Sequence, residues 1–158
     1  PIGYFDETLP RFSKMKFGYI PEFLREEFIH YDTFSLHDNG DLVYSGSFPA
    51  TVIDALSFFY SKKAVMVSLR EAEIIKLAHN GAISARLAYF SEINRYCKEN
   101  DIDGEKIINI VTNHKRIGKE YNKPPFKIGG KCLPKDIITL ASAFKSNFLN
   151  SIVNLINK

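Results

Sequence analysis

One helical pattern, from about residue 70 to residue 100, limits the folds open to this chain more than any other feature. The stretch reads LREAEIIKLAHNGAISARLAYFSEINRYCKEN and repeats apolar residues at helical spacing around most of its circumference. A helix that is apolar on most sides is buried, so we expect one long, deeply buried helix. Small or apolar residues share one of its faces: Ile74, Ala78, Ala82, Ala85, Ala88 and Ile93. Because Gly81 would let a second backbone approach closely, we expect this helix to form a homodimer interface.

Short strands are expected before this helix. Between about residues 15 and 70, FGYI, DLVYSG and AVMVSL read as strands, and PATVIDALSFFY reads as a helix opened by Ser47 and Pro49. This order is typical of an α/β layer. Because so few strands do not form a stable sheet alone, their partner strands are expected elsewhere.

Further helices and one loop are expected after the long helix. DGEKIINIVTNHKRI begins at a helix cap, Asp103, and GKEYNKPPFKIGGKC is a loop rich in Gly and Pro. The segment from Pro134 onward reads as one or two helices, with Pro134 in a first turn. The predicted fold class is therefore α+β, with a mainly helical domain that follows a partial α/β sheet segment.

Composition excludes several kinds of function. The net charge is only +3 and the lysines are scattered, so we expect no nucleic-acid partner. Two cysteines are too few for a disulfide framework, and no Cys/His spacing predicts a metal site. We expect reduced thiols in the cytoplasm, with neither export nor a membrane span. The chain begins with Pro and stops inside an apolar periodic stretch, so both ends look cut.

The segment IGGKCLPKD, residues 128–136, is the strongest candidate for chemistry. A helix N-terminus and nearby cations favour the thiolate form of a cysteine, and Cys132 lies between Lys131 and Lys135 at a predicted helix start. Asp136 is four residues on, where it could orient a water or a lysine. The alternative is that Cys132 packs as a small apolar residue while the lysines face solvent.

Other polar residues allow two interpretations each. Cys97 continues an apolar helical register and reads as a packing residue. On the long helix, Glu73, Lys76 and Asn80 share one face, where Lys76 is either functional or an ion-pair partner of Glu73. Glu22 and Glu26 follow a strand and are either site residues or a solvated helix start. GGKC lacks the spacing of a phosphate-binding P-loop, and a Cys132 pairing with His114 has no support beyond composition.

Four segments together resemble the UDP-glucose and GDP-mannose dehydrogenase family. They are PEFLRE at 21–26, AEIIKLAHN at 72–80, RIG at 116–118 and GGKCLPKD at 129–136. The resemblance runs nearly end to end, and EYNKPPFKIGGKCLPKD is most similar to the UDP-glucose 6-dehydrogenase branch. It implies that residues 1–69 are the C-terminal tail of an NAD domain. Residues 70–158 are then a central dimerisation domain that runs into an inter-domain helix.

The resemblance also implies a reaction and its residues. That family oxidises C6 of a nucleotide sugar twice with NAD, from an alcohol through a covalently held aldehyde to a thioester, which water hydrolyses to the uronic acid. Cys132 would be the nucleophile, Lys76 and Asn80 would stabilise the C6 oxyanion, and Asp136 would align Lys76 and the hydrolytic water. The remaining implied roles are Glu22 as a candidate base, Glu26 as its support, Tyr121, Phe126, Gly129 and Gly130 in substrate binding, Arg116 reaching across a dimer interface, and Lys135 in cofactor binding.

Three features depart from that family. No G-x-G-x-x-G occurs, so we expect no NAD and no turnover for this chain alone. Lys127 stands where the substrate loop usually has glycine, and Lys131 replaces a smaller or aromatic residue beside the nucleophile. Three interpretations stay open: part of a nucleotide-sugar 6-dehydrogenase, a non-catalytic dimerisation or interaction module derived from that family, or another thiol enzyme that uses Cys132.

Overall fold

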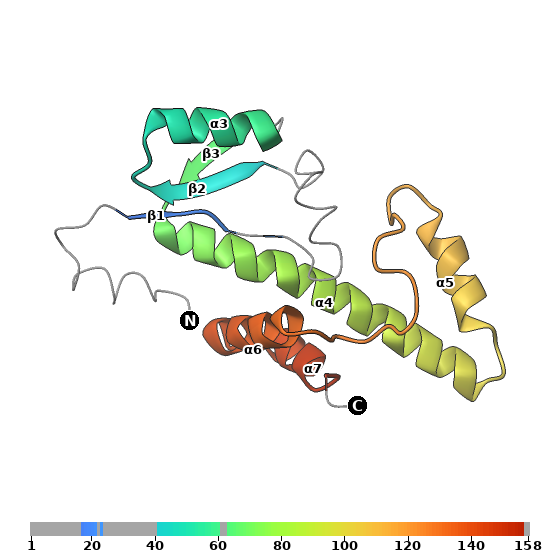
Figure 1. The fold of residues 1–158 in the computed structure, drawn as a ribbon. Coiled ribbons are helices and arrows are strands. Elements are labelled where there is room, and N and C mark those ends of the chain that lie inside the picture. The colour runs from blue at the N-terminus through green and yellow to red at the C-terminus, as the bar shows by residue number, and fades with distance from the viewer. Residues whose placement is uncertain (1–16, 22, 24–40, 61–62, 157–158) are drawn as a thin grey trace. The chain divides into compact units, whose positions relative to one another are not determined.

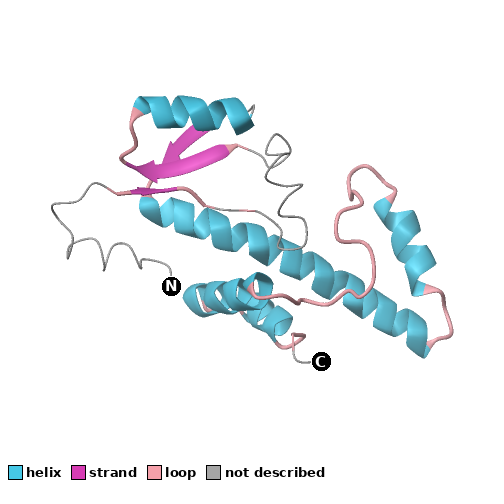
Figure 2. Cartoon of the chain, in the orientation of Figure 1, coloured by secondary structure: helices cyan, strands magenta, loops and turns pink. Residues whose placement is uncertain are grey.

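Helices make up most of the described structure, and a small sheet lies in its N-terminal part (Figure 1). The computed structural model describes residues 17–21, 23, 41–60 and 63–156. The chain forms two compact units, Pro1–Lys76 and Leu77–Lys158. Among the described residues, strands occur only in the first unit, and the second consists of helices and loops (Figure 2). The predicted α+β fold class is confirmed.

The sheet of the first unit has three described strands. They are β1 (Gly18–Tyr19), β2 (Leu42–Gly46) and β3 (Ala64–Val67), in the order β1-β2-β3. Strand β1 is antiparallel to β2, with Gly18 opposite Gly46, and β2 is parallel to β3, with Leu42 opposite Ala64. The three predicted strands therefore form one sheet.

Helix α3 (Ala50–Tyr60) connects the two parallel strands, β2 and β3. Its first turn is closed by the Pro49 carbonyl, which accepts hydrogen bonds from the N–H groups of Val52 (3.0 Å) and Ile53 (3.3 Å). Pro49 therefore marks the helix start, three residues before Val52, whereas Ser47 lies in the irregular segment between β2 and α3. A helix between parallel neighbouring strands makes this segment a βαβ unit, which agrees with the predicted α/β layer.

The predicted long helix is α4 (Leu69–Glu99), with 31 residues. Its first turn is a reciprocal capping box. The Ser68 N–H donates to Glu71 Oε2 (2.7 Å), and the Glu71 N–H donates to Ser68 Oγ (3.2 Å). At 1.5 Å of rise per residue the helix is roughly 46 Å long.

Burial along α4 is uneven. Ala72 and Phe90 are 0% and 2% exposed, but Tyr89 and Tyr96 are 59% and 60% exposed. Ala78 and Ala82 are exposed too. In the single chain α4 is therefore buried on one side only, and burial of its other face in a subunit interface stays a prediction.

Three shorter helices follow in the second unit, and the predicted starts of the first two are confirmed. Helix α5 (Gly104–Thr112) is capped by Asp103, whose side chain accepts from the Lys106 N–H at 3.0 Å. Helix α6 (Cys132–Phe144) holds Pro134 in its first turn, where no helical N–H is needed. Helix α7 (Asn147–Val153) is capped by the Ser146 hydroxyl.

A cluster of buried side chains joins α4 to α5 and to the long loop that follows. Phe90, Ile108 and Phe126 are 2%, 1% and 7% exposed, and Ile93 packs against them. The rings of Phe90 and Phe126 lie 6.1 Å apart between centroids. The loop is therefore attached to the helical core through an aromatic contact.

Gly81 allows a close approach, but its neighbour belongs to the same chain. A Cβ at Gly81 would lie 2.7 Å from Leu140 Cδ2 and 3.8 Å from Ile137 Cδ1, both on α6. Contacts of 2.7 Å to a Cβ essentially do not occur, so a larger residue here would force the Leu140 side chain to shift. Gly81 therefore packs α6 onto α4 instead of admitting a second subunit.

Within the described ranges, no helix is both long enough and apolar enough to span a lipid bilayer.

Candidate functional site

The two cysteines lie in opposite environments. Cys132 is the first residue of α6 and its thiol is exposed. Cys97, near the end of α4, is 3% exposed. Cys97 therefore packs in the core, as predicted, and Cys132 is accessible to a reactant.

The backbone before Cys132 leaves this helix end open. Lys131 occupies the N-cap position with helical dihedral angles (φ −87°, ψ −31°), and no side chain caps the helix. Gly130 has φ +73°, which only glycine adopts without strain, and no described atom lies within 4 Å of a Cβ placed on Gly129 or Gly130. The first N–H groups of α6 are thus accessible to an anion or an oxyanion.

Asp136 lies one turn after Cys132 and is only 4% exposed. Its Oδ2 accepts a hydrogen bond from Asn80 Nδ2 at 2.6 Å, across 56 residues of sequence. Asn80 is itself 6% exposed. A buried carboxylate is stable only with such partners, so this pair connects the middle of α4 to the first turns of α6.

Two more groups complete the hydrogen bonding around this pair. Lys135 Nζ lies 3.4 Å from the other carboxylate oxygen of Asp136, although 70% of the Lys135 side chain is exposed. His79 Nδ1 lies 3.2 Å from Asn80 Oδ1. Because Asn80 Nδ2 donates to Asp136, Oδ1 is the acceptor for His79, and the orientation of the amide is thereby determined.

Lys76 lies one helical turn before Asn80 on α4. Its Nζ is 5.1 Å from the ring centroid of Phe23, within the range of a cation–π contact. Phe23 belongs to the segment PEFLRE, so Lys76 lies next to one of the segments that carry the family resemblance. Glu22 and Glu26, the two predicted carboxylates of this segment, lie outside the described residues.

The loop before α6 is anchored by alternate side chains. Phe126 and Ile128 are 7% and 4% exposed, while Lys127 between them is exposed. The Phe126 ring packs in the core, so in this conformation only its backbone can serve a ligand. The Lys127 side chain, which stands where the family usually has glycine, extends into solvent.

Tyr121 and Arg116 lie further back in the same loop. Tyr121 is half-buried and has φ +54°, which is rare for a residue with a side chain. Arg116 is exposed, and its backbone N–H donates to His114 Nδ1 at 3.3 Å. Arg116 is therefore accessible on the surface of the single chain.

Sequence reasoning missed two residues that hold this loop. The Arg86 guanidinium on α4 donates to the carbonyls of Ile117, Gly118 and Glu120. Asn122 Nδ2 donates to the Oγ1 of Thr112 on α5 at 2.8 Å. Arg86 lies on a helix and Asn122 lies in the loop itself, and in both places polar side chains usually face solvent, so neither residue gives a signal in the sequence. Only the length of the loop indicates that such anchors are needed.

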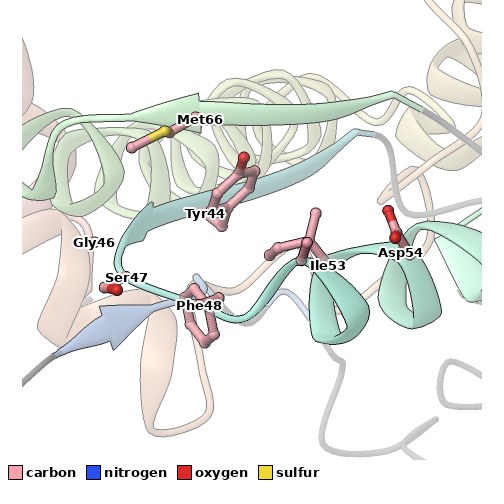
Figure 3. A pocket seen from close by; sticks show the side chains of 8 residues that line it. Tyr44, Gly46, Ser47, Phe48, Ile53, Asp54 and Met66 are labelled. Carbon is pink, nitrogen blue, oxygen red and sulfur yellow. The ribbon is translucent and has the colours of Figure 1, made fainter.

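A hollow of about 420 Å³ lies in the first unit (Figure 3). Tyr44 of β2 and Met66 of β3 line it together with Ile53 and Asp54 of α3. Phe48 lies edge-on to Tyr44, with ring centroids 6.3 Å apart. This lining contains neither a thiol nor a cation, so it does not serve the chemistry predicted for Cys132.

Four groups therefore lie near the start of α6: the thiol of Cys132, the buried carboxylate of Asp136, the carboxamide of Asn80 and the ammonium group of Lys135. A thiolate at such a position can attack an electrophilic carbon. N–H donors nearby can stabilise the oxyanion that results, and a carboxylate can orient water for hydrolysis. The arrangement suits acyl or aldehyde chemistry through a covalent thiol adduct.

Comparison with known proteins identifies relatives over nearly the whole sequence. The central domain of the UDP-glucose/GDP-mannose dehydrogenase family matches residues 70–158. A UDP-glucose 6-dehydrogenase of Streptococcus pneumoniae is 31% identical over 164 residues, which cover 97% of this chain and 42% of the relative. A UDP-glucose 6-dehydrogenase of Campylobacter jejuni is 34% identical over 160 residues, which cover 99% and 40%. The chain thus spans about two fifths of the length of these relatives.

The fold also has a counterpart among solved structures. A UDP-glucose dehydrogenase from the hyperthermophilic archaeon Pyrobaculum islandicum superposes with a TM-score of 0.71. The match covers 90% of this chain and 34% of that protein, at 23% sequence identity. At this identity the likeness establishes the shared fold.

Proposed function

The chain belongs to the UDP-glucose/GDP-mannose dehydrogenase family, and from this membership we propose that it provides the thiol site of a nucleotide-sugar 6-dehydrogenase. UDP-glucose is the proposed substrate and UDP-glucuronate the product, a precursor for polysaccharide biosynthesis. One observation carries the proposal. The exposed Cys132 begins an uncapped helix one turn before a buried carboxylate that a distant amide holds in place.

NAD supplies the hydride acceptor for both oxidations in the proposed reaction. The residues present do not fit a complete NAD site, because the sequence has no G-x-G-x-x-G and Lys135 is one exposed side chain that contacts Asp136. No step is therefore assigned to the cofactor, and this chain alone forms no NADH from UDP-glucose. Residues 1–69 and 70–158 correspond in this proposal to the tail of an NAD domain and the central domain.

The steps assigned to this chain concern the thiol. The Cys132 thiolate attacks the C6 aldehyde, a C–S bond forms, and the carbonyl electron pair moves onto oxygen. After the second oxidation the product is a thioester. Water adds to that carbonyl, the C–S bond breaks, and the thiolate leaves together with a carboxylate product.

Asn80 and Lys76 stabilise the C6 oxyanion in this scheme. An amide has two N–H donors; Asp136 accepts one from Asn80, and the other serves the oxyanion. Lys76 adds a positive charge from one turn earlier on α4. Removing one such donor typically lowers kcat by roughly 10² to 10³. Asp136, held by Asn80, aligns Lys76 and the water that hydrolyses the thioester.

The loop before α6 binds the nucleotide sugar. Open space next to Gly129 and Gly130 allows the sugar to approach the backbone. Tyr121 and the backbone of Phe126 flank this part of the loop. Glu22 and Glu26 serve as the base and its support, as the resemblance implies.

A homodimer through α4 is part of the proposal. The exposed residues Ala78, Ala82, Tyr89 and Tyr96 lie at intervals of four and seven along α4, and so share one face. Small and aromatic residues on one exposed face are typical of an interface. Arg116 then reaches the site of the partner subunit. We expect a dimer in sedimentation at micromolar concentration, and a monomer would contradict this part of the proposal.

The proposed reaction belongs in the cytoplasm. Both cysteines are free, and an exposed nucleophilic thiol stays reduced only in a reducing compartment. Neither a membrane nor a nucleic acid takes part.

Alkylation rates test the proposal directly. We expect iodoacetamide to modify Cys132 at pH 7 at least about tenfold faster than an ordinary exposed thiol, because the thiolate is the reactive form. A matched control is the Cys132→Ala/Lys98→Cys variant, which carries an exposed thiol in the last turn of α4, where the helix dipole disfavours the thiolate. Equal rates at residues 132 and 98 would rule out the activated thiol.

The same experiment separates the alternative, a dimerisation or interaction module without chemistry. That alternative predicts a dimer with an ordinary thiol at Cys132. NADH formation by this chain alone with UDP-glucose would contradict the assignment in a different way, because it would require a dinucleotide site within these residues.

A further inference from the structure

Arg86, a half-buried residue of α4, makes an unusual set of contacts. Its Nε donates to the Glu120 carbonyl at 2.7 Å, and its two terminal nitrogens donate to the carbonyls of Ile117 (3.0 Å) and Gly118 (2.6 Å). All three acceptors are backbone oxygens, more than 30 residues away in the sequence. Arginine therefore acts here as a clamp on one turn of the loop.

That turn needs an external partner for its backbone. Gly118 has φ +76° and Tyr121 has φ +54°, so two of these four consecutive residues have left-handed backbone angles. Left-handed residues interrupt regular hydrogen bonding within the segment, so the carbonyl groups of this turn need N–H donors from elsewhere in the chain. A planar guanidinium with five N–H donors can satisfy three carbonyls at once, which a lysine cannot do in the same geometry.

The same side chain also contacts the aromatic residue of α4 on which the other end of the loop packs. Arg86 Cζ lies 5.0 Å from the ring centroid of Phe90, a cation–π contact. Phe90 is 2% exposed and packs against Phe126, at 6.1 Å between ring centroids. Arg86 and its buried aromatic support thus hold the loop on both sides of the segment from Tyr121 to Phe126.

We infer that Arg86 is a positioning residue for nucleotide-sugar binding. It sets the turn at residues 117–120, and this turn determines where Arg116 and Tyr121 present their side chains. The inference rests on the proposed function, because it assigns to Arg86 the arrangement of that function's substrate-binding loop. Arg86 itself touches neither the substrate nor the reacting atoms.

Two substitutions at Arg86 and one control test this inference in the full chain. Arg86→Gln removes the charge and most donors, and Arg86→Lys keeps the charge but not the planar fork. Arg95→Gln is the matched control, since Arg95 lies on the same helix and bonds only to the exposed carboxylates of Glu92 and Glu99 among described residues. The readouts are amide hydrogen exchange of residues 117–122, exchange of α5 and the Kd for UDP-glucose by calorimetry.

For Arg86→Gln we expect exchange at 117–122 and the Kd for UDP-glucose to rise roughly 10- to 100-fold, as two or three lost hydrogen bonds of ordinary strength imply. Exchange in α5 stays within about threefold of wild type, because the helical core remains. Arg86→Lys gives intermediate values, and Arg95→Gln gives wild-type values. A purely structural role would instead raise exchange throughout α5 as well.

Each other outcome contradicts a specific part of the inference about Arg86. If Arg86→Gln leaves the loop exchange unchanged, or loosens the loop without weakening UDP-glucose binding, Arg86 is not a positioning residue. If Arg86→Lys has the same loop exchange and the same Kd for UDP-glucose as wild type, the three hydrogen bonds of the planar guanidinium are not what positions the loop. If the wild-type chain does not bind UDP-glucose, the proposed substrate fails, and loop exchange alone then decides whether Arg86 sets the turn.

Discussion

Helices α4 and α6 begin in different ways. At the start of α4, Ser68 and Glu71 satisfy each other's backbone N–H groups within four residues of sequence. At the start of α6, the N-cap residue Lys131 makes no such bond, and an exposed cysteine occupies the first helical position. The polar partner that α6 does acquire, Asn80, comes from α4, 56 residues earlier than Asp136.

This difference separates a helix end used for stability from one left open to chemistry. A capping side chain occupies the first N–H groups and lowers the free energy of the helix. Without it, those N–H groups and the positive end of the helix dipole stay available to a thiolate or an oxyanion. The stability that α6 forgoes at its first turn must come from packing against Gly81 and from Asp136.

The largest expected effect comes from exchanging the two thiols for hydroxyls. In a protein that joins this chain to a dinucleotide-binding domain, the proposed function requires that Cys132→Ser lower UDP-glucose-dependent NADH formation by more than about 10³-fold, since it removes the nucleophile. Its stability should not change, because the thiol is exposed. Cys97→Ser should show the reverse, with normal turnover and a loss of about 1–3 kcal/mol in the free energy of unfolding, because the hydroxyl is buried. Equal turnover in the two variants would contradict the different roles assigned to Cys132 and Cys97.

The next effect concerns the long-range pair at α6. Asp136→Ala leaves the buried Asn80 amide without its acceptor and should cost about 1–3 kcal/mol in urea unfolding. Asp136→Asn keeps an acceptor oxygen and should cost less. A double-mutant cycle with Asn80→Ala should give a coupling energy above about 0.5 kcal/mol. Additive losses would mean that the two side chains do not stabilise each other.

A smaller effect should distinguish capped from uncapped helix starts. Asp103→Ala removes the cap of α5 and should destabilise the protein by about 1 kcal/mol in denaturant titration. Lys131→Ala at the start of α6 should change stability by less than about 0.5 kcal/mol, as for an exposed residue that makes no cap. A loss at Lys131 as large as that at Asp103 would show that α6 has a cap after all.

The smallest effect is the pH dependence of the α4 cap. Hydrogen bonds from the Ser68 backbone N–H and, second, from its hydroxyl lower the pKa of Glu71 below its ordinary value of 4.5. A lowered carboxyl pKa stabilises the fold above pH 4.5, and this contribution is lost as the pH falls through the folded-state pKa. Glu71→Gln should therefore melt at a slightly lower temperature than wild type at pH 7, with the difference shrinking below pH 4.5. A pH-independent difference would contradict the linkage.

Local signals in the sequence predicted the elements well. Asp103, Pro134 and the strand and helix periodicities mark their elements because each acts over a few residues. The long helix was predicted for the same reason. Periodicity reports that a face is apolar or small, but it does not distinguish packing within the chain from packing against a second subunit.

The sequence predicts which residues make up the site, but not which residues they contact. The segment around Cys132 is conspicuous because a thiol, two lysines and a carboxylate lie within six residues. The bond between Asn80 and Asp136, the partner of Gly81 and the clamp of Arg86 depend on elements that meet only in the folded chain. No local property of these residues encodes their partners.

The two compact units do not mark a place where the chain can be divided. Their boundary falls between Lys76 and Leu77, inside α4. Separating the units there would cut the hydrogen-bond ladder of a 31-residue helix and expose four new N–H groups without a cap. An expression boundary that keeps α4 intact has to precede Ser68, so that the helix retains the serine and glutamate that close its first turn.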